Sequence, residues 1–214
     1  MDIVLLTLGN TIDKTFFSFD FAIFEFFGNI QCGFLNIIAK IFTAFGDEAF
    51  VIPMIVLGAV LMLFKKTRKY GFALFFAIIV GTLITNVLVK PMALRIRPYN
   101  TLQEYADYMG WYNFAGAFSE SDYSFPSGHT TAAFEMATAL FLVFRSNGKK
   151  KICWLFPVIA VLTMCSRVYL MVHYPTDVLA GMLVGILAGV IGFFLMKLCM
   201  KLITDVKLFK WIDN

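Results

Sequence analysis

Charged residues are scarce in this chain, since Asp, Glu, Lys and Arg make up only 15% of its 214 residues. A soluble domain of this size carries about 25% charged residues, so the scarcity argues against a water-soluble globular protein. Hydrophobic residues make up 60% of the chain and its mean hydropathy is +0.79. We therefore expect an integral membrane protein, with the membrane and a lipid as its partners and no nucleic acid.

Cysteine and histidine are also rare, with four cysteines and two histidines in the chain. The cysteines are scattered through apolar sequence and show neither a Cys-x-x-Cys pair nor the spacing of metal ligands. They are Cys32, Cys153, Cys165 and Cys199. We interpret them as small buried hydrophobic residues and predict no metal site and no cofactor.

Five apolar segments approach the roughly 20 residues that a helix needs to cross the hydrocarbon core of a bilayer. They are residues 49–64, 70–89, 129–144, 152–172 and 178–198. The sequence thus predicts an all-α fold, a polytopic membrane helical bundle with five transmembrane helices. We expect a single transmembrane core over residues 49–214, preceded by a separate N-terminal segment over residues 1–48.

That N-terminal segment is apolar and aromatic, but it carries Asp20, Glu25 and Lys40 within its apolar stretches. Such charges cost about 2.5–3.5 kcal/mol each at the centre of a bilayer. The pattern favours amphipathic helices that lie at the membrane interface. A sixth, imperfect span through residues 21–45 is the alternative.

Lysine and arginine in short loops predict the orientation of the bundle. Loops 65–69 and 145–151 carry four such residues each, and four more follow near the C-terminus, Lys197, Lys201, Lys207 and Lys210. Five alternating spans put all three regions on one side, which should be the cytosol. The acidic loop 99–125 and the turn 173–177 then face the extracytoplasmic side.

Four cations do not fit this pattern, since Lys90, Arg95, Arg97 and Arg167 belong to the outer side or lie within an apolar span. Snorkelling of long side chains toward water is one explanation. A buried anion explains the cluster better. We interpret Arg95, taken alone, as a lipid-headgroup contact or a structural residue.

Three short stretches collect these cations and both histidines. Lys90 and Arg97 are seven residues apart, so they share one face if the stretch between them is helical. Ser127 and Gly128 directly precede an apolar helix, whose free N–H groups and dipole can bind an anion beside His129. The alternative for this second stretch is an ordinary helix cap with an interfacial histidine.

In the third stretch, Arg167 lies near the end of an apolar segment, His173 follows it, and Asp177 opens the next. A carboxylate four residues after a histidine can hold one ring N–H and so determine which nitrogen is free. This is the arrangement of a base with its orienting group in nucleophilic catalysis. Because both histidines accompany cations at the same membrane face, the three stretches together predict a site for a phosphate ester.

The order and spacing of these residues resemble the type 2 phosphatidic acid phosphatase family. Soluble vanadium haloperoxidases and glucose-6-phosphatase share the signature. The matching motifs cover residues 90–177 and comprise Lys90 with Arg97-Pro98, then Pro126-Ser127-Gly128-His129, then Ser166-Arg167 with His173 and Asp177.

The resemblance implies a role for each residue. His173 is implied as the nucleophile that forms a phosphohistidine, with Asp177 orienting it, and His129 as the group that protonates the leaving oxygen and then activates water. The implied phosphate-binding residues are Lys90, Arg97, Ser127, Gly128 and Arg167. Three fixed cations can replace a metal, so we expect metal-independent hydrolysis.

We therefore expect a multi-pass cell-membrane phosphatase, of a bacterial plasma membrane, that acts on a lipid phosphate or diphosphate at the extracytoplasmic face. Undecaprenyl diphosphate is the favoured substrate, by analogy, with phosphatidic acid or phosphatidylglycerol phosphate as the alternative. A lipid phosphotransferase is a second alternative. A non-catalytic lipid-binding or transport protein is the alternative from a different class.

Overall fold

A computed structural model describes residues 7–205, and every regular element within this range is helical, as predicted. The elements, in chain order, are α1 (Leu8–Asn29), α2 (Gly33–Thr43), η1 (Ala44–Gly46), α3 (Glu48–Met62), α4 (Arg68–Thr82), η2 (Leu83–Val89), α5 (Lys90–Ala93), α6 (Pro98–Thr101), α7 (Ala106–Ala115), α8 (Gly128–Ser146), η3 (Ile152–Trp154), α9 (Leu155–Tyr169) and α10 (Pro175–Asp205).

Each of the five predicted spans coincides with a helix, but fewer of them are long and apolar enough to cross a membrane. Three segments meet that standard among the described residues: Arg68–Thr101, Ile152–Tyr169 and Pro175–Thr204. A fourth is reached if Gly33–Gly46 and Glu48–Met62, which meet at a bend of 41°, form one broken span. Over residues 7–205 the protein is thus an all-helical membrane protein with three or four apolar spans, and the count of five or six stays a prediction.

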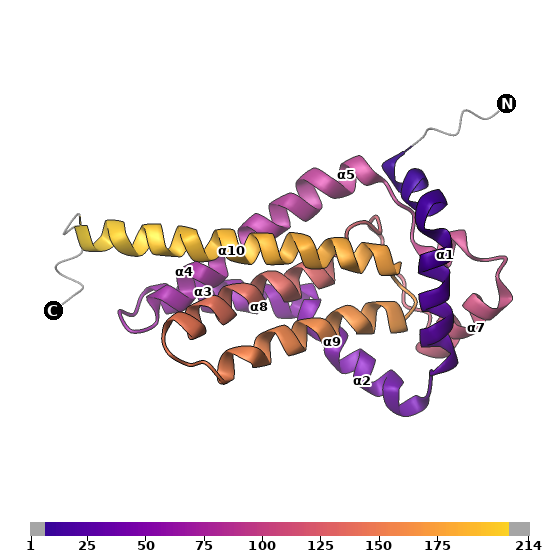
Figure 1. Cartoon of the computed structure of the whole chain (residues 1–214), viewed down its shortest axis with the longest axis horizontal. Coiled ribbons are helices and arrows are strands. Elements are labelled where there is room, and N and C mark those ends of the chain that lie inside the picture. The colour runs from indigo at the N-terminus through magenta and orange to yellow at the C-terminus, as the bar shows by residue number, and fades with distance from the viewer. Residues whose placement is uncertain (1–6, 206–214) are drawn as a thin grey trace.

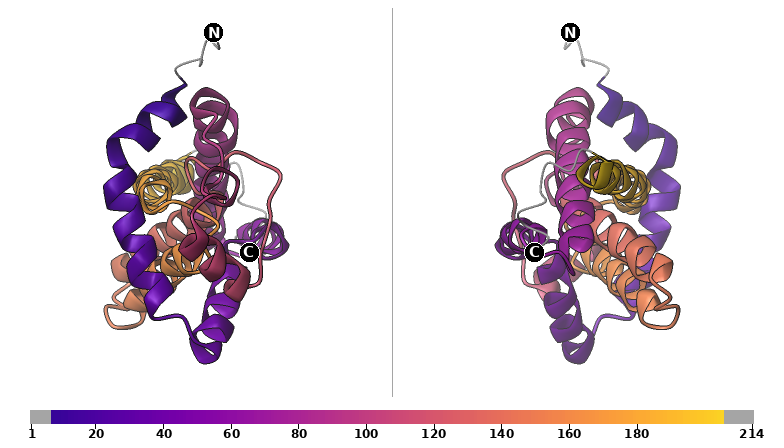
Figure 2. Two further views of the ribbon diagram at one scale, coloured as in Figure 1. Left: turned by 90° about the vertical axis from the view of Figure 1, so that its right-hand side faces the viewer. Right: turned by 90° about the vertical axis from the view of Figure 1, so that its left-hand side faces the viewer.

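Helix α8 is not among these spans, and it lies inside the bundle. It packs between α4, α9 and α10, and polar residues such as Thr130, Thr131 and Glu135 are buried along it (Figures 1 and 2). A helix surrounded by other helices can carry polar groups that a lipid-facing helix would expose at high cost.

Glycines along one face of α10 bring it close to α8. A Cβ at Gly185 would lie 2.6 Å from Cβ of Phe134, and one at Gly189 would lie 2.5 Å from Cβ of Thr138. Gly181 likewise approaches the backbone oxygen of Ser127. Small residues at this spacing let membrane helices pack backbone to backbone, so the starts of α8 and α10 are held side by side.

The two basic loops lie at one end of the bundle, as the alternating spans predicted. Lys69, the last residue of the first loop, donates a hydrogen bond to Asn147 in the second, and the ring of Tyr70 lies 5.1 Å from that of Phe144. The described end of α10 lies at the same end (Figure 1). Lys207 and Lys210 fall outside the described residues.

Helix α1 lies across the opposite end of the bundle, over the starts of α8 and α10 (Figures 1 and 2). It exposes several phenylalanines, among them Phe16, Phe19 and Phe26, while its Asp20 is only 2% exposed. The interfacial position of residues 1–48 and the boundary at residue 48 stay predictions. If α2 and α3 form one broken span, that span crosses the boundary.

Candidate active site

The predicted site residues come together at the end of the bundle that α1 covers. Lys90 begins α5, Arg97 precedes α6, and Ser127 to His129 open α8. Arg167 lies near the end of α9, His173 in the link that follows it, and Asp177 in the first turn of α10. Three motifs that are far apart in sequence thus meet in one cluster of polar side chains.

His173 lies between a carboxylate and a guanidinium and is 1% exposed. Its Nδ1 is 3.4 Å from Oδ2 of Asp177, and its Nε2 is 3.0 Å from Nη1 of Arg97. Oδ2 of Asp177 also accepts hydrogen bonds from Ser124 Oγ and, at 3.0 Å, from the backbone N–H of Tyr174. The carboxylate on the Nδ1 side favours a hydrogen there and leaves the lone pair on Nε2.

The pKa of His173 lies well below its usual 6.5, first because the ring is buried and then because Arg97 and Arg167 are close. Both causes disfavour the charged imidazolium. At neutral pH the ring is therefore uncharged. A neutral imidazole with a free Nε2 is the form that can act as a nucleophile.

The acidic loop before α8 supplies two carboxylates to the predicted cations, which the sequence had not indicated. Asp122 pairs with Lys90 and Arg97, and Glu120 pairs with Arg97 and Arg167. The carboxylate of Glu120 is also 3.9 Å from His173 Nε2 and 3.9 Å from His129 Nδ1. A carboxylate thus lies where the cations and both histidines converge.

The cations dominate the charge state of these two acids. Burial alone would raise the pKa of Glu120, but Arg167 and Arg97 hold it below its usual value. Burial acts in the same direction on Asp122, and Lys90 and Arg97 lower its pKa to about 2. Both acids are ionised at neutral pH, so the site binds two anionic groups of its own chain.

His129 occupies the first turn of α8 on the side of α3. Its Nε2 is 3.6 Å from Oδ2 of Asp47, the residue that caps α3, and its side chain is 17% exposed. Gly46 allows this contact, because a Cβ there would lie 2.4 Å from the backbone oxygen of His129. His129 is therefore more open to a ligand than His173.

Ser127 and Gly128 form the start of α8 as predicted. The hydroxyl of Ser127 accepts hydrogen bonds from Thr130 N at 3.4 Å and from Thr130 Oγ1 at 3.0 Å, which makes Ser127 the N-cap. At Gly128 an added Cβ would meet only the ammonium of Lys90, at 3.4 Å. The helix start thus faces a cation of the first motif, which suits an anion-binding site.

Arg95 is not a headgroup contact, because it is 1% exposed. Its guanidinium contacts Asp177 of the predicted site and two acids of α1. Of the two roles predicted for Arg95, a lipid-headgroup contact or a structural residue, the structure supports the second.

Sequence reasoning missed Asp47, Glu120, Asp122 and Ser124. A usable signal was present for Glu120 and Asp122, since they are the last acids before the Pro-Ser-Gly-His stretch and lie in the loop predicted to be on the same side of the membrane as Lys90 and Arg97. No comparable signal marks Asp47 or Ser124. Among residues 7–205, no group of three or more His, Cys, Asp or Glu side chains is arranged to hold a metal ion.

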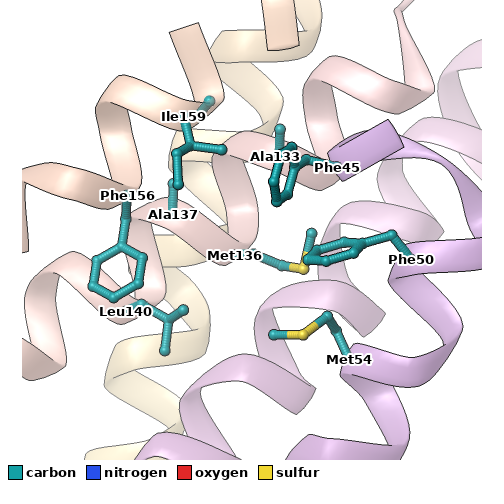
Figure 3. A pocket seen from close by; sticks show the side chains of 10 residues that line it. Phe45, Phe50, Met54, Ala133, Met136, Ala137, Leu140, Phe156 and Ile159 are labelled. Carbon is teal, nitrogen blue, oxygen red and sulfur yellow. The ribbon is translucent and has the colours of Figure 1, made fainter. Parts of the chain in front are cut away.

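An apolar cavity of about 160 Å³ lies between α3, α8 and α9 (Figure 3). Its lining is entirely apolar and comprises Phe45, Phe50, Met54, Ala133, Met136, Ala137, Leu140, Phe156, Ile159 and Ala160. Ala133 is one turn below His129 on α8, and Phe45 adjoins Gly46. The cavity therefore begins next to the polar site.

Comparison with known proteins finds relatives over most of the chain. Residues 70–201 match the model of the PAP2 superfamily. Phosphatidylglycerophosphatase B of Bacillus subtilis is 36% identical over 78% of this chain and 76% of its own length. Undecaprenyl-diphosphatase of Sulfolobus acidocaldarius is 32% identical over 78% of this chain and 73% of its own length.

Two solved structures have a similar fold. The transmembrane PAP2-type phosphatidylglycerolphosphate phosphatase of Bacillus subtilis superposes with a TM-score of 0.69, at 31% identity, over 91% of this chain and 90% of that chain. LpxE of Aquifex aeolicus superposes with a TM-score of 0.59, at 26% identity, over 90% of this chain and 98% of that chain.

Proposed function

This chain belongs to the PAP2 superfamily, and from that premise we propose that it is a membrane lipid phosphatase that works through a phosphohistidine on His173. The proposed substrate is a lipid phosphate or diphosphate, and the proposed location is the extracytoplasmic face of a bacterial plasma membrane. The location rests on the basic loops at the far end of the bundle, which favour that end as cytosolic.

The observation that carries the proposal is the position of the Glu120 carboxylate. It contacts Arg97 and Arg167 and lies 3.9 Å from each histidine. A phosphoryl group has the same sign of charge and similar acceptor oxygens, so it can replace this carboxylate among the same donors. In that position it is within reach of a nucleophile on one side and a proton donor on the other.

In the first step, Nε2 of His173 attacks phosphorus while the bond from phosphorus to the leaving oxygen breaks. Burial and the neighbouring cations lower the pKa of His129 to about 3 in the free site, so this step requires the bound phosphoryl anion to favour its protonation. His129, protonated in that complex, gives its proton to the leaving oxygen, so the lipid leaves as a neutral alcohol or, from a diphosphate, as a protonated monophosphate. Asp177 stabilises the positive charge that develops on the ring of His173. Lys90, Arg97 and Arg167 stabilise the negative charge on the phosphoryl oxygens.

In the second step, neutral His129 takes a proton from water, which attacks the phosphohistidine. The bond from phosphorus to Nε2 breaks, its electron pair returns to the ring, and inorganic phosphate leaves. Ser127 and Gly128, at the start of α8, add donors to the phosphoryl oxygens. Both histidines end in their original protonation states.

The charge already present at the site supports metal independence. Three cationic side chains neutralise a phosphoryl group as a pair of Mg²⁺ ions does in other phosphoryl-transfer enzymes. Oxygen ligands that would suit Mg²⁺ at this site, Glu120 and Asp122, are occupied by Lys90, Arg97 and Arg167. We therefore propose hydrolysis without a metal or another cofactor.

The apolar cavity supports a substrate with a hydrocarbon chain. Apolar cavities of about 150 Å³ bind hydrocarbons of the size of benzene and exclude water, and the cavity beside His129 encloses about 160 Å³. The hydrocarbon chain of a lipid substrate is as well solvated by the membrane as by apolar side chains. The cavity therefore orients the substrate and does not increase its affinity. The part of the chain nearest the phosphate would lie in it.

We expect Ile159→Trp, which fills the cavity from α9, to lower kcat/KM for a long-chain lipid phosphate by tenfold or more. A misplacement of about 1 Å at a reacting centre can cost about 100-fold in rate. Activity on a short, water-soluble phosphate ester should stay within about twofold, because such a substrate does not need the cavity. Phosphate release from both substrates by detergent-solubilised protein measures the difference.

Val158→Trp is the matched control, since Val158 is the preceding residue of α9 and is 53% exposed on the outer surface. It introduces the same side chain without entering the cavity. Equal losses of kcat/KM in the two variants, or equal losses on both substrates, would contradict the placement of the substrate's hydrocarbon chain in the cavity.

We favour an isoprenoid diphosphate of the undecaprenyl type as substrate, and the relative named undecaprenyl-diphosphatase supports this choice. Phosphatidylglycerol phosphate is the second candidate, supported by the name of the Bacillus subtilis relative and its solved structure. Phosphatidic acid follows by the analogy of its phosphate monoester. All of them carry a terminal phosphoryl group, so the leaving group, the headgroup and the hydrocarbon chain distinguish them.

A substrate panel in the presence of EDTA tests the proposal. We expect the purified protein to release phosphate from at least one of undecaprenyl diphosphate, phosphatidylglycerol phosphate and phosphatidic acid, at a rate that EDTA leaves unchanged. A rate that EDTA abolishes and Mg²⁺ restores would overturn metal independence. Transfer of labelled phosphate to an added lipid or sugar instead of water would favour a phosphotransferase, and no turnover would favour a lipid-binding or transport protein.

A further inference from the structure

Arg95 is a fully buried guanidinium that joins the start of α10 to helix α1. Nη1 contacts Oδ1 of Asp177 at 2.6 Å and Oγ1 of Thr176 at 2.7 Å. On the α1 side, Nε contacts Asp13 at 2.8 Å and Nη2 contacts Asp20 at 2.9 Å. The side chains of Arg95 and Asp177 are both 0% exposed.

The two carboxylate oxygens of Asp177 have different partners, and Arg95 determines which oxygen faces His173. Oδ1 accepts from Arg95, while Oδ2 faces His173 Nδ1 and accepts from Ser124 and from the N–H of Tyr174. Holding Oδ1 fixes the plane of the carboxylate. Oδ2 therefore points at the ring of His173 rather than rotating away from it.

Helix α1 takes part in the same arrangement through Asp20. Its carboxylate accepts from the backbone N–H of Thr176 at 2.9 Å and from the hydroxyl of Thr176 at 2.8 Å. These donors lie at the start of α10, where a helix has free N–H groups and favours a negative charge. Asp13 is seven residues earlier on α1, so both acids lie on one face of that helix and meet the same guanidinium.

We propose that Arg95 is a positioning residue for phosphoryl transfer, and that through it α1 forms part of the active site. The inference rests on the proposed function, because it concerns the alignment of His173 by Asp177. Arg95 lies between the fixed positions Lys90 and Arg97 of the first motif and is not one of them, and α1 lies outside residues 70–201, which match the family model. Arg95 contacts neither the predicted nucleophile nor the predicted phosphate ligands directly, so it acts through Asp177.

Charge explains why Arg95 is more than a structural link. Three carboxylates, of Asp13, Asp20 and Asp177, share its single positive charge. A buried carboxylate that loses its cation tends to take up a proton. Protonated Asp177 would hold the ring of His173 less firmly and would not stabilise the positive charge that forms on it during attack.

The test is Arg95→Gln, which removes the charge and keeps a side chain of similar polarity. We expect kcat for the best lipid substrate to fall about 100-fold, with KM changed by less than about twofold. The residual kcat should also rise with pH where the wild type is flat. The titratable groups that face Asp177 are Arg95 and His173, and Asp13 and Asp20 lie behind Arg95. Without the charge of Arg95, a higher pH is needed to ionise the carboxyl group of Asp177.

Arg68→Gln is the matched control, because Arg68 is also a buried arginine but begins α4 at the other end of the bundle. Its kcat and pH profile should equal those of the wild type. Arg95→Lys, which restores the charge but not the fork of donors, should recover part of the loss. If Arg95→Gln does not fold, Asp20→Asn carries the test, with a several-fold lower kcat and the same change in pH profile.

Trapping of labelled phosphoenzyme separates this inference from the proposed function. An active wild type with a slowly phosphorylated Arg95→Gln supports both. An active wild type together with Arg95→Gln of unchanged kcat and unchanged pH profile overturns the inference alone, and so does a loss confined to KM. A wild type without turnover overturns the proposed function.

Discussion

Replacing His173 with alanine is expected to abolish phosphate release, with kcat lowered by at least about 10⁴-fold. The reason is that the lost group forms the covalent bond to phosphorus, which no neighbouring side chain can replace. Asp177 and Ser124 lie on the Nδ1 side of the ring, and Arg97 on the Nε2 side is positively charged. Turnover of a lipid phosphate and trapping of acid-labile, labelled phosphoprotein measure the loss.

The phosphoprotein should disappear together with turnover, because both require Nε2. The fold should remain, since His173 lies in the link between α9 and α10 and its removal exposes no helix to a new environment. An unchanged melting temperature in detergent checks this. Normal turnover by His173→Ala would rule out the proposed mechanism, and labelled phosphoprotein in that variant would move the nucleophile elsewhere.

Much of the composition of the candidate site was predictable because its residues lie in three compact motifs. His173 and Asp177 are four residues apart, so their contact follows from local geometry. The meeting of Lys90, Arg97 and Arg167 could be inferred only because all three seemed misplaced for a membrane protein. Cationic side chains in or beside apolar segments were the signal, and they predicted a site for an anion.

The supporting residues could not be predicted because their contacts join distant segments. Asp20 meets Thr176 across most of the length of the chain. From sequence, this acid was only a charge that made an aromatic stretch unsuitable as a span. Arg95 looked like one more cation at the interface, and nothing local indicated that Asp13 and Asp20 would neutralise it.

The number of spans was the least predictable feature of the fold. Helix α8 is where predicted, but its environment is the other helices, so its polarity reveals little about whether it faces lipid. The bend between α2 and α3 comes at Gly46, which fits against His129. That contact belongs to the tertiary structure and leaves no periodic pattern in the sequence.

His129→Ala is expected to separate the two half-reactions, with an effect that depends on the leaving group. Proton transfer by a positioned side chain contributes about 10²–10⁴-fold. A lipid alcohol is a poor leaving group, so we expect kcat to fall by about 10³-fold with a lipid monophosphate. With p-nitrophenyl phosphate, whose leaving group needs no proton, formation of the phosphohistidine should be nearly normal.

Breakdown of that intermediate still needs water activated by His129. In His129→Ala, p-nitrophenyl phosphate should therefore give a burst of nitrophenol of about one equivalent per enzyme, followed by slow turnover and accumulated phosphoprotein. Asp47→Asn is a milder comparison, since Asp47 is 3.6 Å from His129 and only helps to orient it. A His129→Ala variant that loses both substrates equally and shows no burst would mean that His129 binds phosphate rather than moving protons, because only the protonic role makes its removal depend on the leaving group.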